Sequence, residues 1–213
     1  MNIILLGPPG SGKGTQAEAL SARLRVPSIS TGNILREAIR NEIRIGLEAK
    51  SYIDAGQLVP DGVMIGIMKD RLGQPDCAEG FILDGFPRTL AQAEALDAIG
   101  ARVDAVLSLE VADEDIEKRM SGRRSCKNCG AAYHMTSKPP ACPDVCDHCG
   151  GELFIRDDDN LETVRDRLTV YHQNTEPLKI YYEGKGKLRA VPARDGIGKI
   201  TGRCIEALGL QTS

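Results

Sequence analysis

The chain has 213 residues, of which 41% are hydrophobic and 27% charged, and its formal net charge at pH 7 is −3. This composition is typical of a globular protein and excludes a disordered chain. The slightly acidic balance argues against a general nucleic-acid coat. The apolar start, residues 3–6, is too short for a signal peptide, and no run approaches the ~20 apolar residues of a membrane span. We therefore expect a cytoplasmic protein with no membrane or nucleic-acid partner.

Directly after that apolar start comes a glycine-rich segment, Gly7–Thr15, with the sequence GPPGSGKGT. An apolar strand, a glycine-rich turn, a lysine and a helical pattern in this order predict a phosphate-binding P-loop. The glycines let backbone N–H groups converge on an anion, the helix start adds N–H donors, and Lys13 adds a full charge. Gly14 stands where GTPases and motor ATPases carry a Ser or Thr that binds Mg²⁺.

Strand-like and helical patterns alternate along the rest of the chain. We expect strands over residues 2–6, 27–30, 81–83, 105–109 and 188–191. Helical patterns cover residues 12–24, 61–72, 89–99, 113–120, 160–183 and 197–208, with Asp61, Thr89, Asp113 and Asn160 as N-caps and a kink or split at Pro177. This alternation predicts an α/β fold with a doubly wound parallel sheet, helices on both faces, and ligands at the carboxyl ends of the strands.

Two segments interrupt the alternation. Residues 31–59 contain only helical patterns, and residues 122–159 are rich in Cys, Pro and Gly and have no helical period. Both are predicted to be insertions into one core domain.

Four cysteines in the second insertion form two C-x₂-C pairs, Cys126/Cys129 and Cys146/Cys149, separated by sixteen residues. This spacing predicts a tetrahedral zinc site, and four thiolates leave no open position, so the zinc would be structural rather than catalytic. Cys142, His134 and His148 are alternative ligands that break the symmetry of the two pairs. A zinc ribbon that binds nucleic acid is a rival interpretation, disfavoured by few aromatic residues for base stacking.

Charged side chains next to the predicted strands and insertions point to phosphate chemistry. Asp84 ends an apolar strand, where an aspartate can hold the waters of Mg²⁺ near a P-loop. Arginines bracket the Cys-rich insertion, and guanidinium groups can hold the oxygens of a moving phosphoryl group: Arg119, Arg123, Arg124, Arg156, Arg165 and Arg167. Gln92 fits either a helix capping box with Thr89 or base recognition, and the sequence leaves both open.

The chain closely resembles the adenylate kinases of the bacterial long-lid, zinc-bearing type over nearly its whole length. The resemblance rests on Gly7–Thr15, on the motifs STGNILR (30–36), LDGFPRT (83–89) and GRR (122–124), on the four cysteines, and on RDDD (156–159) with ETVxxR (162–167). It implies a five-stranded parallel sheet in a core of residues 1–29, 60–121 and 160–213. It also implies an AMP-binding insertion of residues 30–59 and a zinc-bound lid of residues 122–159. The implied reaction is transfer from ATP to AMP giving two ADP, with Mg²⁺ on ATP, in a monomer.

The resemblance also implies roles for individual residues. ATP would be held by Gly10, Ser11, Gly12, Lys13, Gly14, Thr15, Arg119, Arg123, Ala132, Tyr133 and Gly198. AMP would be held by Thr31, Arg36, Gln57, Leu58, Val59, Gly85, Phe86, Pro87, Arg88, Gln92, Arg156 and Arg167. The transferred phosphoryl group would be surrounded by Lys13, Arg88, Arg123, Arg156 and Arg167, with Asp84 nearby. Asp158 and Asp159 match the acidic pair at the lid hinge.

One position departs from the family pattern, because Asn33 stands where an Asp is usual. This puts a charged role at this position, such as a water-mediated link to Mg²⁺, in doubt. Two other functions remain to be separated by experiment: a UMP/CMP kinase, and a P-loop ATPase or GTPase switch carrying a zinc-ribbon interaction module.

Overall fold

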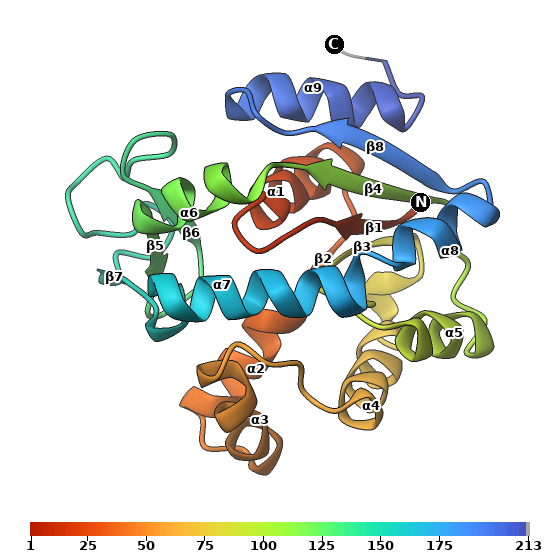
Figure 1. The fold of residues 1–213 in the computed structure, drawn as a ribbon, viewed down its shortest axis with the longest axis horizontal. Coiled ribbons are helices and arrows are strands. Elements are labelled where there is room, and N and C mark those ends of the chain that lie inside the picture. The colour runs from red at the N-terminus through yellow and green to blue at the C-terminus, as the bar shows by residue number, and fades with distance from the viewer. Residues whose placement is uncertain (212–213) are drawn as a thin grey trace.

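A parallel sheet forms the centre of the computed structural model, which describes residues 1–211. Its strands are β1 (Asn2–Leu6), β2 (Ser28–Ser30), β3 (Phe81–Asp84), β4 (Ala105–Glu110) and β8 (Leu188–Pro192). They lie in the order β2-β3-β1-β4-β8 and are parallel throughout (Figure 1). The predicted five-stranded parallel sheet is confirmed, with strand ends shifted by at most one residue.

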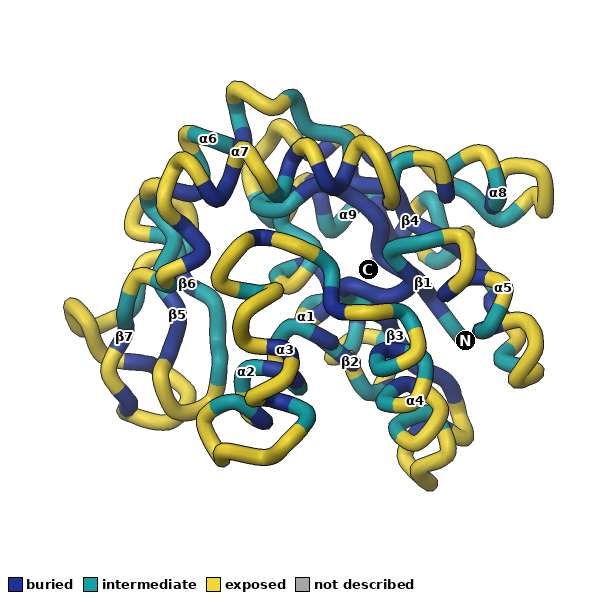
Figure 2. Tube along the Cα trace, turned by 60° about the horizontal axis from the view of Figure 1, so that its bottom comes forward, coloured by how far each residue is buried: buried dark blue, intermediate teal, exposed yellow. Residues whose placement is uncertain are grey.

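Helices cover both faces of this sheet because its strands are apolar on both sides. Ile3 and Leu5 pack with α1 (Lys13–Leu24) and α9 (Ile197–Ala207). Ile4 and Leu6 face the opposite way, toward α4 (Asp61–Leu72), α5 (Leu90–Ala98) and α8 (Leu178–Gly184). Figure 2 shows the central strands as the most buried part of the chain. The doubly wound arrangement is therefore confirmed.

Two of the four predicted N-caps are correct. The Thr89 side chain accepts a hydrogen bond from the Gln92 amide, and that of Asn160 accepts one from Thr163. Asp61 and Asp113 are instead the first residues of α4 and α6 (Asp113–Ser121), after Pro60 and Ala112, and neither helix has a side-chain cap. Their carboxylates still lie in the first turn, where negative charge is favourable.

The long helical pattern after residue 160 is divided. Helix α7 (Leu161–Val170) continues into a π-helical segment, Tyr171–Thr175, and α8 begins after Pro177. The ring of Pro177 has no N–H to donate, so the predicted split falls at the proline.

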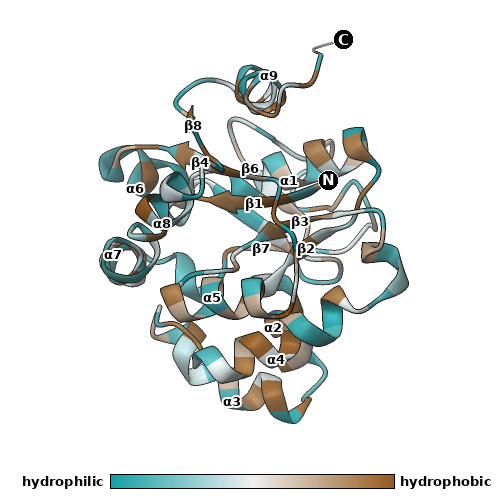
Figure 3. Ribbon diagram, turned by 90° about the vertical axis from the view of Figure 1, so that its right-hand side faces the viewer, coloured by the Kyte–Doolittle hydropathy of each residue, from teal (hydrophilic) through white to brown (hydrophobic). Residues whose placement is uncertain are grey.

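The first insertion consists of α2 (Thr31–Arg40) and α3 (Arg44–Asp54), which pack against each other at the lower edge of Figure 1. Leu35 of α2 and Met64 of α4 belong to the same hydrophobic core cluster, and both helices carry hydrophobic, brown segments in Figure 3. Gly46 of α3 is buried, and a Cβ at this position would overlap the backbone of Ala38 and Ile39 in α2. Within residues 1–211, no helix is both long and apolar enough to cross a membrane.

We expect Gly46→Ala to destabilise the insertion by about 1–3 kcal/mol, because backbone atoms cannot move aside for the added methyl group. Gly66→Ala in α4 is the matched control, since nothing lies within 4 Å of its Cβ position. That change should stabilise by about 0.5–1 kcal/mol through helix propensity. Urea unfolding and amide hydrogen exchange of α2 and α3 would measure the change in stability of both variants. Equal changes in the two variants would contradict the argument that the backbone of α2 leaves no room for a side chain at Gly46.

The second insertion contains a small antiparallel sheet that the sequence did not predict. Its strands are β5 (Arg123–Cys126), β6 (Ala132–His134) and β7 (Leu153–Phe154), in the order β6-β5-β7. The insertion has a core of its own, in which Tyr133 and Leu153 pack with Cys126 and Cys146. Its two ends join α6 and α7, which pack together through Ile116, Met120, Val164 and Leu168. The division into three domains remains a prediction.

Candidate active site

The turn between β1 and α1 is built for close backbone approach. Gly10 has a φ of +76°, and a Cβ there would lie 2.8 Å from Sδ of Met120. Gly12, with a φ of +98°, is the N-cap of α1. Only glycine adopts both conformations without strain, so the turn can place several N–H groups around one anion.

Lys13 lies inside this turn. Its Nζ donates to the carbonyl oxygens of Gly7 at 2.7 Å and Pro8 at 2.8 Å. The residue as a whole is half-buried, but its ammonium group is enclosed by protein. Burial lowers the pKa of Lys13 to about 7, Asp84 opposes this effect, and Arg88, Arg167 and Arg123 add to it. An anion bound in the turn would restore the charged form.

Five arginines from different parts of the chain join Lys13 in one cationic cluster. Arg36 comes from α2, Arg88 follows β3, Arg123 begins β5, Arg156 precedes a short 3₁₀ turn (Asp157–Asp159), and Arg167 lies on α7. Burial lowers the pKa of Arg36, Arg88, Arg123 and Arg156 from the usual 12.5, and neighbouring guanidinium groups add to the effect. The Nε of Arg156 is buried without a hydrogen-bond partner. The cluster therefore holds an excess of positive charge among partly buried side chains, which suits the binding of a polyphosphate.

Three carboxylates partly balance the cluster. Arg167 Nη1 lies 2.7 Å from Asp158 Oδ2, and Arg123 Nε lies 3.2 Å from Asp159 Oδ2. Burial favours the protonated form of both carboxyls. For Asp158 the neighbouring arginines outweigh burial and the pKa lies below its ordinary value, whereas for Asp159 burial outweighs the arginines and the pKa lies above it. The third, Asp84, ends β3 and lies beside the P-loop, with Oδ2 3.5 Å from the Cβ position of Gly14.

Two cavities meet at this cluster. The larger, of about 1060 Å³, runs along the P-loop and under the second insertion. The smaller, of about 120 Å³, lies between the sheet edge and the first insertion. Four cationic side chains line both cavities: Lys13, Arg36, Arg88 and Arg167.

Nearly all the residues predicted to bind nucleotide lie on these cavities. The larger is lined by Gly10, Ser11, Gly12, Lys13, Gly14, Thr15, Asp84, Arg119, Arg123, Ala132, Tyr133 and Arg156. The smaller is lined by Thr31, Arg36, Gln57, Leu58, Val59, Gly85, Pro87, Arg88, Gln92 and Arg167. The groups predicted for each nucleotide thus lie mainly on separate cavities. Arg156, predicted for AMP, lines only the larger cavity, and four cationic residues line both: Lys13, Arg36, Arg88 and Arg167.

Two predicted residues lie elsewhere. Phe86 is buried in the core and lines neither cavity. Gly198 is exposed and lines neither, whereas its neighbour Ile197 lines the larger one. The sequence also missed Tyr171, which lines the smaller cavity from the π-helical segment. An apolar or aromatic residue inside a helical pattern gives no signal that it faces a cavity rather than the core.

The second insertion is docked over the larger cavity by contacts with both other parts. Arg40 of α2 donates to the carbonyl oxygens of Lys127 and Asn128, at 2.8 and 2.6 Å. Lys138 lies 2.7 Å from Glu18 of α1. These contacts hold the second insertion over the larger cavity.

Asn33, the departure from the expected pattern, has a clear partner. Its Oδ1 accepts a hydrogen bond of 2.6 Å from Arg36 Nη2. A neutral amide orients this guanidinium without neutralising it, so Arg36 keeps its full charge for a phosphate.

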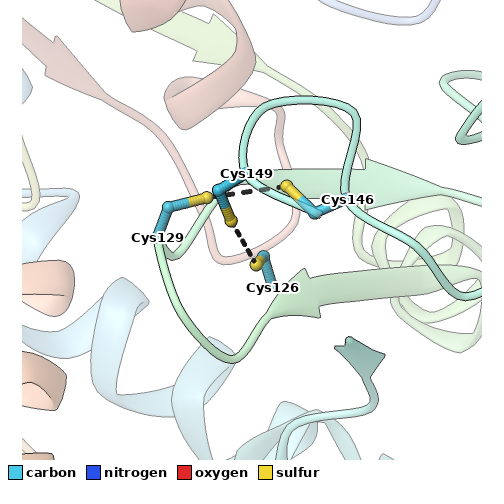
Figure 4. Close-up of side chains that lie close together, drawn as sticks. All are labelled: Cys126, Cys129, Cys146 and Cys149. Atoms are coloured by element: carbon cyan, nitrogen blue, oxygen red, sulfur yellow. Dashed lines mark hydrogen bonds between the residues drawn. The ribbon is translucent and has the colours of Figure 1, made fainter. Parts of the chain in front are cut away.

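The four paired cysteines converge in the second insertion (Figure 4). All four Sγ atoms lie within 4.8 Å of one another, with Cys126–Cys149 at 3.5 Å and Cys129–Cys146 at 3.6 Å. Zinc bound tetrahedrally to sulfur at ~2.3 Å requires S–S separations of about 3.8 Å, so the cluster is compatible with zinc. Burial alone would raise the pKa of the Cys146 thiol. Hydrogen bonds from the Tyr133 hydroxyl and from backbone amides outweigh burial and lower this pKa to about 6. A thiolate is the form that binds metal. Cys142 lies outside this cluster.

The fold and the site together define a P-loop protein in which two cavities share a cluster of cationic side chains. The family model described as adenylate kinase matches residues 5–187. An adenylate kinase of Caldicellulosiruptor bescii is 55% identical and covers 99% of this chain and 100% of its own. The adenylate kinase of Archaeoglobus fulgidus is 56% identical, and the match covers 95% of this chain and 94% of that protein. The adenylate kinase of Syntrophobacter fumaroxidans is 50% identical, and the match covers 98% of this chain and 100% of that protein. The chain belongs to the adenylate kinase family.

Proposed function

We propose that this protein catalyses the reversible transfer of the γ-phosphoryl group of ATP to AMP, giving two ADP. The observation that carries the proposal is the junction of the two cavities, where Lys13, Arg36, Arg88 and Arg167 line both. ATP lies in the larger cavity with its phosphates on the P-loop, and AMP lies in the smaller one. Family membership supports this choice over other P-loop reactions.

Catalysis depends on the positioning of the two nucleotides and on the stabilisation of negative charge in the transition state. The phosphate of AMP is already anionic at neutral pH, since the second pKa of a phosphomonoester is about 6, so no general base is required. An AMP phosphate oxygen forms a bond to the γ-phosphorus as the bond to the β,γ-bridging oxygen breaks, and ADP leaves. Lys13 and the arginines hold the two polyanions in line and neutralise the charge that spreads over the equatorial oxygens.

The residues present fit both metal ions that the family implies. Asp84 provides a carboxylate beside the P-loop, where Mg²⁺ bound with ATP would be held through its waters and would neutralise phosphate charge. Cys126, Cys129, Cys146 and Cys149 would hold a structural Zn²⁺. An insertion of residues 122–159 has too small a core to keep its shape alone, and a metal held by these cysteines would make it rigid enough to move as one body.

Closure of this lid has a second purpose. An open P-loop would transfer phosphate to water, and the docked insertion keeps water away while completing the arginine cluster. Arg40 and Lys138 stabilise that closed arrangement. We place the protein in the cytoplasm as a monomer, with ATP, AMP and ADP as its ligands.

Nucleotide chromatography tests the proposal. The protein is mixed with Mg-ATP and, in separate reactions, AMP, CMP, UMP, GMP or no acceptor. ADP formed with AMP only, and disproportionation of ADP alone into ATP and AMP, are the expected results. Equal or better phosphorylation of CMP or UMP would make it a pyrimidine nucleotide kinase, and loss of ATP without acceptor would make it a P-loop ATPase.

A further inference from the structure

A hydrogen-bond network outside the cavities fixes the one amide side chain predicted to meet the base of AMP. Gln92 is only 2% exposed and lines the smaller cavity. Its Oε1 accepts from the backbone N–H of Arg88 at 2.8 Å, and its Nε2 donates to Asp61 Oδ1 at 2.7 Å. Gln92 therefore lies between one group that can only donate and one that can only accept.

These two neighbours allow a single orientation of the amide. A backbone N–H cannot accept a hydrogen bond, and an ionised carboxylate cannot donate one. Rotating the Gln92 amide by 180° would place Nε2 against the Arg88 N–H and Oε1 against the Asp61 carboxylate, so that both contacts would become repulsive. The other Asp61 oxygen, Oδ2, accepts a hydrogen bond from the Thr89 hydroxyl at 3.0 Å, and this contact takes no part in orienting the Gln92 amide.

The fixed orientation matters because it determines which purine the amide can pair with. The amide of Gln92 has one N–H and one oxygen lone pair left after these contacts. Adenine presents a donor at N6 beside an acceptor at N1, whereas hypoxanthine and guanine present an acceptor at O6 beside a donor at N1. A fixed amide whose N–H and oxygen match adenine faces like groups on hypoxanthine or guanine and repels them. Only an amide rotated by 180° could pair with these 6-oxopurines.

We propose that Asp61 is a specificity-determining positioning residue: it holds the Gln92 amide in the orientation that accepts a 6-aminopurine monophosphate and rejects a 6-oxopurine monophosphate. Asp61 lines neither cavity and acts through Gln92. The inference rests on the proposed function, because it assumes that AMP occupies the smaller cavity. It also explains why Asp61 does not cap α4: its carboxylate is held by Thr89, the N-cap of α5, and by Gln92 in the first turn of α5.

The test compares AMP with IMP as acceptors. IMP differs from AMP only in the exchanged pattern at positions 1 and 6 and has no 2-amino group that could clash. Wild-type protein should prefer AMP in kcat/KM by about 100-fold or more, since two buried contacts would be mismatched with IMP. In Asp61→Asn, whose amide can present either an acceptor or a donor, the preference should fall about tenfold. Its KM for AMP should rise while kcat at saturating AMP stays within about threefold.

Thr89→Val is the matched control. It removes the N-cap of α5 and the contact to Asp61 Oδ2, but it leaves both contacts of the Gln92 amide. It should lower the melting temperature and leave the AMP-to-IMP preference unchanged, which separates a local loss of stability from a loss of amide orientation. Asp61→Ala replaces Asp61→Asn if the latter does not fold.

The outcomes separate the two proposals. If wild-type protein does not phosphorylate AMP, the proposed function fails and the inference fails with it. If AMP is phosphorylated but wild type accepts IMP equally well, the inference alone is overturned, whatever the variants do. It is also overturned if Asp61→Asn keeps the wild-type preference, or if Thr89→Val loses it to the same extent.

Discussion

Lys13→Met is expected to lower kcat by a factor of about 10²–10³ and to leave the fold at least as stable as that of the wild type. The loss of turnover follows from removing a charge directed at the transferred phosphoryl group. The variant should be no less stable because burial disfavours the charged form of Lys13 in the free protein and lowers its pKa to about 7. Replacing this buried ammonium group with an apolar side chain removes that cost. Steady-state kinetics and urea unfolding of the same preparation would measure both effects.

Lys69→Met is a suitable control because Lys69 is exposed on α4, away from the cationic cluster. It should change neither kcat nor the unfolding free energy measurably. Near-normal kcat in Lys13→Met would refute the role of this lysine in transfer. A large loss of stability in Lys13→Met would instead show that its contacts with Gly7 and Pro8 support the loop.

The same lysine gives a dependence on pH. Its pKa is about 7 in the folded protein and 10.5 ordinarily, so between these values the unfolded chain binds more protons, and this group's contribution to stability rises with pH. At pH 8 the free protein holds Lys13 mostly neutral, and a bound polyphosphate favours its charged form. ATP binding at pH 8 should therefore take up about one proton, measured by calorimetry in buffers of different ionisation enthalpy, and Lys13→Met should abolish this uptake.

Removal of the metal from the four-cysteine cluster is expected to unfold the lid and to spare the core. Structural zinc in small domains contributes about 10–16 kcal/mol of apparent binding free energy, far more than the small core around Tyr133 and Leu153 can replace. Treatment with a chelator, or Cys146→Ser, should raise the rate of limited proteolysis within residues 122–159 by ~100-fold or more. The main unfolding transition of the core should remain near its original temperature.

Cys142→Ser provides the control within the same lid, because Cys142 is exposed and lies outside the cluster. It should retain one metal ion per chain and resist proteolysis like the wild type. Unchanged melting and unchanged proteolysis of the lid after metal removal would overturn the structural role of the metal.

Sequence patterns predicted the sheet and most of the site because both depend on local signals. The P-loop, Thr31 and Asp84 each follow a strand, and the carboxyl ends of parallel strands lie at one edge, so their convergence could be predicted. The cysteine pairs were likewise predictable, since a metal imposes a spacing on its ligands.

What could not be predicted depends on distant partners. Asp61 precedes a helical pattern and looked like a cap, but its hydrogen-bond partners, Thr89 and Gln92, are 28 and 31 residues further along. The strands β6 and β7 have three and two residues and are paired only through β5. Runs of this length carry no alternation that a sequence pattern could reveal. Gly198 was carried over by resemblance, and no physical property of glycine indicates whether it faces a cavity.

The packing of α6 against α7 also bears on how the lid folds. Ile116 and Met120 pack with Val164 and Leu168, so the core itself holds together the two points at which the lid joins it. In terms of chain entropy, the folded core turns residues 122–159 into a closed loop, and part of the entropic cost of ordering them has already been met. A short turn joining α6 to α7 in place of these residues would therefore leave the core able to fold alone.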